Sequence, residues 1–185
     1  MTAPMNRRDA IRTAGVLVGG ALMASSGILA ACSTDRRQAT SGVLSLEDQS
    51  LIEEIADTLL PTTTASPGAK AAGVGPAINL ILTDSYKADD QQRVVKGLDA
   101  FRATCREKRS GEFVSLSRSD RESLLREIDS AAQKSPTHYF GLVRELAQGA
   151  YFSSETGMTK ALRYIQNPGR WEGCMPLAPG QPAWG

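Results

Sequence analysis

The sequence predicts a single all-α domain of about five or six helices, residues 45–185, that ends in an extended proline-rich tail, residues 167–185. Apolar residues recur through most of this region at intervals of three and four, which is the spacing of one helix face. No run alternates apolar and polar residues with the period of two that marks a half-buried strand. Proline, glycine or a helix-capping residue separates the apolar runs, so the boundaries agree with the periodicity.

The first predicted helix begins at a capping box and ends at a proline. Ser45 and Asp48 stand at the capping-box spacing, with aspartate in the place of the usual glutamate. Apolar residues then recur at helical spacing until Pro61, which cannot continue a helix. Residues 62–75 are rich in Thr, Ser, Pro and Gly and are predicted to form a loop. Pro76 suits the first turn of a second helix.

Three further helices and a short helical stretch are predicted along the rest of the domain. The third helix spans about residues 89–108, and the fourth follows a second capping-box candidate at Ser117. The fifth is predicted to start at Ser135 and Pro136, which fit an N-cap and a first-turn proline. The last stretch covers about residues 156–164.

Residues 1–31 have the layout of an export signal. Arg7 and Arg8 lie ahead of an uncharged, weakly apolar run, and small residues lead to Cys32. The arginine pair resembles the twin-arginine signal for export of folded proteins. The sequence Leu-Ala-Ala-Cys resembles a lipobox, which predicts a lipidated Cys32, a tether over residues 32–44 and a place on the periplasmic side of a bacterial membrane. The alternatives are an ordinary cleavage site beside an unmodified thiol, and an uncleaved membrane helix.

The charge of the chain argues against two classes of partner. Of 21 basic and 20 acidic residues, three arginines and one aspartate lie in residues 1–31, which leaves 18 basic and 19 acidic residues in the mature chain. A nearly neutral domain does not suit binding to nucleic acid or to an anionic lipid surface. Membrane association would therefore depend on the lipid at Cys32.

Two cysteines remain beyond the lipobox. Because an exported protein enters an oxidising compartment, we predict a disulfide between Cys105 and Cys174. A bridge across about 70 residues would remove on the order of 4 kcal/mol of chain entropy from the unfolded state. The alternative is two free thiols.

The sequence predicts no catalytic residue, cofactor site or metal site in this chain. His138 is the single histidine, so a histidine-rich metal site cannot form, and a packed or surface position suits it better. No haem-attachment, dinucleotide-binding or nucleophile-elbow motif is present.

The proline-rich tail carries apolar residues that an extended segment buries poorly by itself. They include both tryptophans of the chain, and they are Trp171, Met175, Leu177 and Trp184. Either the tail wraps the surface of its own domain, or these side chains dock on a partner.

Several pieces of the chain, in their order and spacing, resemble the gluconate 2-dehydrogenase subunit 3 family. Besides the twin-arginine leader they are Leu59, Leu60 and Pro61; Pro67, Gly68 and Ala69 with Gly73 and Val74; Gly111, Glu112 and Phe113 with Leu116; Tyr151 to Gly157; and Tyr164 followed by Pro168 to Cys174. The resemblance covers about residues 46–177. The lipobox departs from the family's more usual signal, which leaves open which subunit supplies the membrane anchor.

The resemblance implies a non-catalytic small subunit of a membrane-associated sugar or polyol dehydrogenase. Its partner would be a large FAD-containing oxidoreductase of the glucose-methanol-choline family, often accompanied by a cytochrome c subunit. FAD would then belong to the partner and not to this chain. The candidate partner-binding residues are Tyr151, Phe152, Trp171, Met175, Leu177 and Trp184. The alternatives are a stand-alone periplasmic lipoprotein that binds a small ligand, and a hydrolase or metal enzyme.

Overall fold

The structure is a computed structural model that describes residues 42–167, 169, 173–174, 176 and 178–184. The predicted export signal with Arg7, Arg8 and Cys32 lies outside the described residues, as do Trp171, Met175 and Leu177. The described elements are α4 (Leu46–Leu59), η1 (Ala69–Ala72), α5 (Val74–Ser85), α6 (Ala88–Arg109), η2 (Phe113–Ser115), α7 (Arg118–Ala132), α8 (Tyr139–Phe152) and η3 (Gly157–Ala161).

The described part of the chain is all-α, as the periodicity predicted. It holds five α-helices, two short 3-10 helices and one π-helical turn. Its β-structure is limited to one isolated bridge, between Arg163 and Trp184. No helix within these residues is long and apolar enough to cross a membrane.

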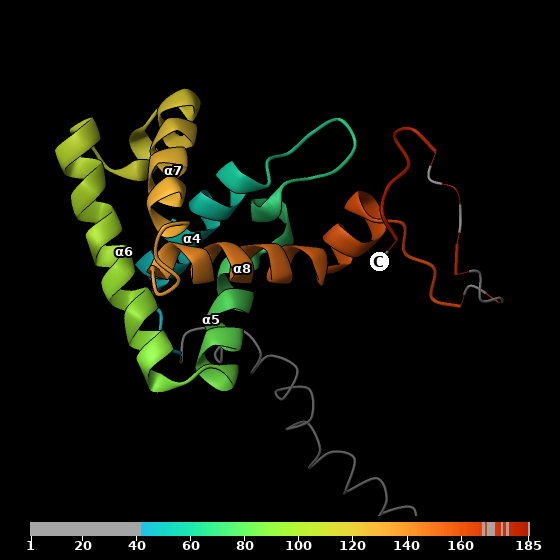
Figure 1. Ribbon diagram of the computed structural model, residues 1–185, viewed down its shortest axis with the longest axis horizontal. Coiled ribbons are helices and arrows are strands. Elements are labelled where there is room, and N and C mark those ends of the chain that lie inside the picture. The colour runs from blue at the N-terminus through green and yellow to red at the C-terminus, as the bar shows by residue number, and fades with distance from the viewer. Residues whose placement is uncertain (1–41, 168, 170–172, 175, 177, 185) are drawn as a thin grey trace, which may run out of the picture. The chain divides into compact units, whose positions relative to one another are not determined.

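Helix α8 is the central element of the domain. It packs against α4, α5, α6 and α7, and Figure 1 shows it running across the middle of the molecule. The domain has one contiguous core because residues from all five helices bury their apolar faces together. The largest fully buried side chains include Phe101, Phe113, Phe140, Ile52, Leu82 and Leu98.

The predicted capping box is present at the start of α4. The Ser45 hydroxyl accepts a hydrogen bond from the Asp48 backbone N–H at 3.1 Å, and the Asp48 carboxylate accepts one from the Ser45 N–H at 3.1 Å. The two bonds satisfy backbone donors that a helix start leaves free. The helix ends at Leu59, before Pro61.

The domain begins three residues earlier than predicted, at Gly42. Leu44, which the sequence predicts as part of the tether, is 1% exposed and belongs to the core. Its backbone N–H donates to the Asn79 side chain of α5 at 2.9 Å, and its carbonyl accepts from Gln49 at 3.0 Å. Burying one leucine contributes about 1.5–3 kcal/mol, which is enough to hold this short segment on the domain.

The predicted start of the fifth helix is wrong. Ser135 and Pro136 lie in a turn, and α8 begins at Tyr139 with His138 as its N-cap. The His138 imidazole accepts a hydrogen bond from the Phe140 N–H at 3.2 Å, and its ring stacks on that of Tyr139. The single histidine therefore has a structural role as a helix cap.

Helices α6 and α8 approach closely where a glycine faces an aromatic ring. Gly97 on α6 is buried against Tyr139, and a Cβ at this position would overlap the tyrosine ring. Gly141, also helical, has no neighbour within 4 Å of such a Cβ.

This contrast predicts opposite effects of one substitution at two glycines. Gly97→Ala should lower the free energy of unfolding by about 1–3 kcal/mol, because the core must shift to admit the methyl group. Gly141→Ala should raise it by about 0.5–1 kcal/mol, because alanine favours a helix. Denaturant unfolding of both variants checks this, and equal changes at the two positions would contradict the packing described.

Candidate functional site

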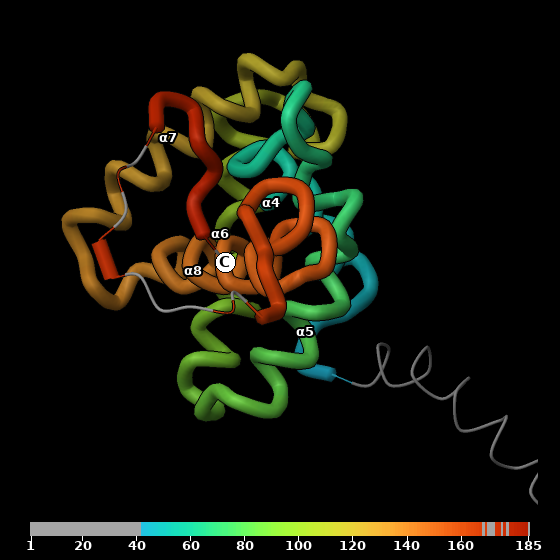
Figure 2. Tube along the Cα trace, turned by 90° about the vertical axis from the view of Figure 1, so that its right-hand side faces the viewer, coloured from blue at the N-terminus to red at the C-terminus, as the bar shows by residue number. Residues whose placement is uncertain are grey.

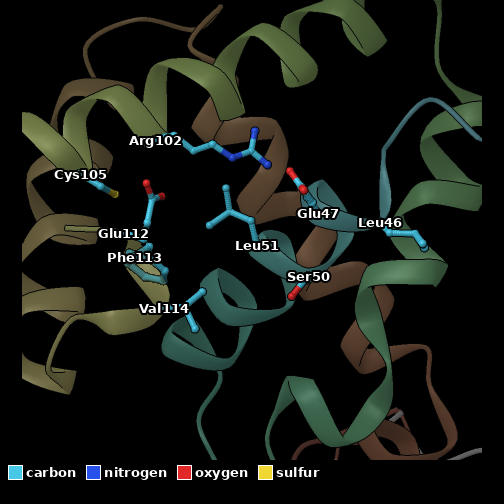
Figure 3. A pocket seen from close by; sticks show the side chains of 9 residues that line it. All are labelled: Leu46, Glu47, Ser50, Leu51, Arg102, Cys105, Glu112, Phe113 and Val114. Atoms are coloured by element: carbon cyan, nitrogen blue, oxygen red, sulfur yellow. The ribbon is translucent and has the colours of Figure 1, made fainter.

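An apolar groove is open on the surface between α4, α6 and η2. We call it the α4–α6 groove, and its volume is about 410 Å³. Figure 3 shows the side chains that line it, which come from these three segments. They are Leu46, Glu47, Ser50, Leu51, Arg102, Cys105, Glu112, Phe113 and Val114.

The groove combines a buried apolar floor with exposed apolar edges. Leu51 and Phe113 are 7% and 2% exposed, whereas Leu46 and Val114 are 65% and 53% exposed. Water-exposed leucine and valine beside a buried floor leave apolar surface that a partner could cover.

The wall between α4 and α6 is held by an ion pair. Arg102 of α6 donates to Asp48 of α4 at 2.6 Å, and it also pairs with Asp99 of its own helix at 3.2 Å. Burial raises the pKa of Asp48, but hydrogen bonds from Ser45 and Arg102 outweigh that effect and hold the pKa below its usual value. Asp48 therefore stays ionised and keeps α6 attached to the first turn of α4.

The wall formed by η2 depends on Arg121 of α7. Its guanidinium donates to Glu54 of α4 at 2.8 Å, to the Leu116 carbonyl at 3.2 Å and to the Val114 carbonyl. The same group lies 5.4 Å from the centre of the Phe113 ring, which is a cation–π distance. One side chain thus fixes both ends of η2 against α4.

Glu54 is the acidic centre of this arrangement. It is 9% exposed, and Lys70 of η1 pairs with the carboxylate oxygen that Arg121 does not use. Burial raises the pKa of Glu54, but hydrogen bonds and charge from Lys70 and Arg121 outweigh that effect, so the pKa lies below its usual value.

The predicted disulfide between Cys105 and Cys174 is absent, and both cysteines are free thiols. Cys105 is fully buried, on the inward side of α6, whereas Cys174 is exposed in the tail. In Figure 1 the described parts of the tail lie at the opposite side of the picture from α6, and Figure 2, turned by 90°, has them in front with α6 behind. Burial raises the pKa of Cys105 to about 11, so its thiol stays protonated.

The predicted partner-binding residues have different surroundings. Tyr151 is 3% exposed, and its hydroxyl donates to the Pro67 carbonyl at 2.6 Å, so it holds the loop before η1. Phe152 is half-buried and stacks edge-on against Tyr151. Both rings pack within the domain, and the surface that they offer a partner is small.

The end of the tail folds back onto its own chain. The Arg163 N–H donates to the Ala183 carbonyl at 2.7 Å, and the Arg163 guanidinium lies 4.3 Å from the centre of the Trp184 ring. Trp184 remains 43% exposed, and Tyr164 and Ile165, which follow Arg163 in the sequence, are exposed as well. Trp184 therefore contacts its own chain and keeps part of its ring exposed.

A comparison with protein families identifies the chain. The family model described as gluconate 2-dehydrogenase subunit 3 matches residues 47–169, which is more than half of the chain and spans the five helices. This chain belongs to the gluconate 2-dehydrogenase subunit 3 family. Comparisons with curated proteins and with solved structures give no match.

Membership in the gluconate 2-dehydrogenase subunit 3 family indicates an accessory subunit of a dehydrogenase complex, which associates with other subunits. Within the described residues, no group of three or more His, Cys, Asp or Glu side chains is placed to hold a metal ion. The apolar surface of the α4–α6 groove is the feature of this family member that suits subunit association best.

Sequence analysis missed the α4–α6 groove as a site. Leu46 falls outside the apolar face of α4, and Val114 lies in a short segment between two helices, so each looked like an isolated surface residue. The sequence feature that could have indicated the groove is that both residues are large and apolar but lie outside the helical pattern.

The paired carboxylates predict a loss of stability in acid. Asp48 and Glu54 have lower pKa values in the folded chain than in the unfolded chain, so their contribution is present above about pH 5 and is lost as the pH falls through about 4 and below. Glu54→Gln should lower the free energy of unfolding by about 1–2 kcal/mol at neutral pH and should weaken its dependence on pH. The expected loss is smaller than for a fully buried pair because the Lys70 side chain is 56% exposed.

Denaturant unfolding at a series of values between about pH 3 and about pH 7 measures this dependence. Glu145→Gln is the matched control, because Glu145 is exposed on α8 and should change little. Parallel pH profiles for the wild-type chain and Glu54→Gln would contradict the role given to Glu54.

The two thiols are predicted to differ in reactivity. In a Cys32→Ser chain without reductant, a maleimide should label Cys174 rapidly in the folded state and Cys105 only after denaturation, because burial keeps the Cys105 thiol protonated and covered. Intact mass spectrometry counts the labels. A denatured, unreduced chain that takes up no label would show that the disulfide forms after all.

Proposed function

We propose that this chain is the non-catalytic small subunit of a periplasmic, membrane-associated, FAD-dependent sugar or polyol dehydrogenase. The observation that carries the proposal is the match of the gluconate 2-dehydrogenase subunit 3 family to residues 47–169. The subunit serves the complex by export, maturation and anchoring, and the partner performs the oxidation.

Export is the first part of the proposal. Arg7 and Arg8 supply a twin-arginine signal, and this route carries proteins that are already folded. A partner that has bound its flavin in the cytoplasm and lacks its own signal can reach the periplasm only by such a route. The small subunit would therefore carry the signal for both proteins.

Anchoring is the second part. Cys32 ends the Leu-Ala-Ala-Cys sequence, and acyl chains on this residue would hold the complex at the periplasmic side of a bacterial membrane. The nearly neutral charge of the mature chain supports this view, since electrostatic attraction to anionic lipid would be weak.

The partner is the third part. We expect a large FAD-containing oxidoreductase of the glucose-methanol-choline family, which holds the flavin and the substrate site, and a cytochrome c subunit as a further member of the complex. The α4–α6 groove and the exposed part of Trp184 supply apolar surface for such contacts.

Purification of the tagged chain from native membranes tests the association. A flavin-containing large subunit should accompany it in near-equal molar amount, measured by flavin absorbance and by densitometry. Recovery of the chain alone, as a stable monomer without flavin, would contradict the proposal and favour a stand-alone lipoprotein.

Two leader variants separate export from anchoring. Replacing Arg7 and Arg8 by lysine should keep the flavoprotein in the cytoplasm, because the export signal is weakened. Replacing Leu29–Cys32 by an ordinary Ala-x-Ala cleavage site, which needs no lipid, should instead leave the flavoprotein exported but move it from the membrane fraction to the soluble periplasmic fraction. A flavoprotein that reaches the periplasm equally in every strain does not depend on this chain for export.

A further inference from the structure

We propose that the α4–α6 groove is where the flavoprotein partner docks, and that it takes an apolar anchor side chain flanked by a lysine or arginine. The inference rests on the proposed function and adds to it the surface and the chemistry of the contact. Three observations carry it: exposed apolar edges, walls held by internal ion pairs, and one acidic side chain without an ion pair.

The edges of the groove favour an apolar occupant. Leu46 and Val114 are two of the three large hydrophobic side chains in the described residues that are more than half exposed, and both line the groove. The third, Leu80, lies on α5. Interfaces place an apolar or aromatic anchor of one protein in a pocket of the other, and the floor of Leu51 and Phe113 fits such an anchor.

The walls are preorganised for binding. Arg102 ties α6 to α4 through Asp48, and Arg121 ties η2 to α4 through Glu54. These contacts exist without a partner, so docking need not order the walls, and less of the binding free energy is lost to ordering.

The charges around the groove indicate which charge the partner brings. Arg102 is already paired with two aspartates, and Glu112 is paired with Arg106 at 2.7 Å. Glu47 is exposed and has no ion pair within the described part of the chain. A partner that places a cation beside its apolar anchor would complement Glu47.

The negative charge of Glu47 argues against two other occupants of the groove. A second copy of this chain, packed groove to groove about a two-fold axis, would put two Glu47 carboxylates into one interface without a cation for either. An anionic lipid surface would be repelled by Glu47 as well. The flavoprotein subunit is the occupant that these observations favour.

Arginine substitutions at the groove edge test the docking site. In the full-length tagged chain purified from membranes, Leu46→Arg and Val114→Arg should each reduce the flavin recovered per chain by about tenfold or more, because each places a charge where an apolar side chain is buried. Leu80→Arg is the matched control, an equally exposed helical leucine elsewhere, and should stay within about twofold of wild type. Equal retention of flavin by the groove variants and the control overturns the proposal.

Charge reversal tests the predicted cation. Glu47→Lys should reduce flavin recovery by about tenfold at low salt and by less at high salt, because the repulsion is screened. Glu145→Lys, an exposed acid on α8, should have no comparable effect. If the two charge reversals change flavin recovery equally, the partner does not place a cation beside Glu47.

A photo-cross-linking residue at Ser50, inside the groove, identifies the occupant without disturbing its walls. Cross-linking to the flavoprotein from Ser50 and not from Leu80 supports the proposal. Suppose that flavin accompanies the wild-type chain but the residue at Ser50 cross-links to a second copy of this chain or to no protein. That result overturns the docking site and leaves the proposed function standing. A wild-type chain that recovers no flavin instead refutes the proposed function and the docking site together.

Discussion

The buried carboxylate of Glu54 is the constraint on which the groove depends. A charged side chain that is 9% exposed must be paired, and Glu54 takes one cation from η1 and one from α7. Arg121 then has donors left for the Val114 carbonyl within η2 and the Leu116 carbonyl just after it, 7 and 5 residues before Arg121 in the sequence. Satisfying one acid therefore positions three segments against α4. The same logic joins α6 to α4 through Asp48, so the first helix carries the acids and the later segments carry the cations.

These internal ion pairs leave the domain with little unsatisfied charge at the groove and with apolar surface still exposed. Leu46 and Val114 bury less than half of their surface on folding, so each contributes less to stability than a core residue does. Such surface is a cost to an isolated domain and an advantage to a subunit. The family membership, which indicates an accessory subunit of a dehydrogenase complex, and the groove therefore agree on association as the role of this chain.

The helices were predictable because their signals are local. The capping box at Ser45 and the apolar spacing after it each span a few residues, and both were confirmed. The errors arose where distant residues decide the structure. Leu44 joins the domain through Asn79, which lies 35 residues away, and the groove combines side chains of Leu46 and Val114 from segments that meet only in the fold. The family resemblance was confirmed, since the order of its motifs is itself a sequence property.

Hydrogen–deuterium exchange of the chain alone and of the chain bound to its flavoprotein tests the docking surface most directly. Backbone amides of residues 45–51 and 112–116, which form the groove, should exchange more slowly in the complex, because docking would cover them. Amides of residues 77–85 on α5 should exchange at the same rate in both states. Protection at α5 or at residues 163–165, with unchanged exchange at the groove, would contradict the account and place the flavoprotein on another face of the subunit.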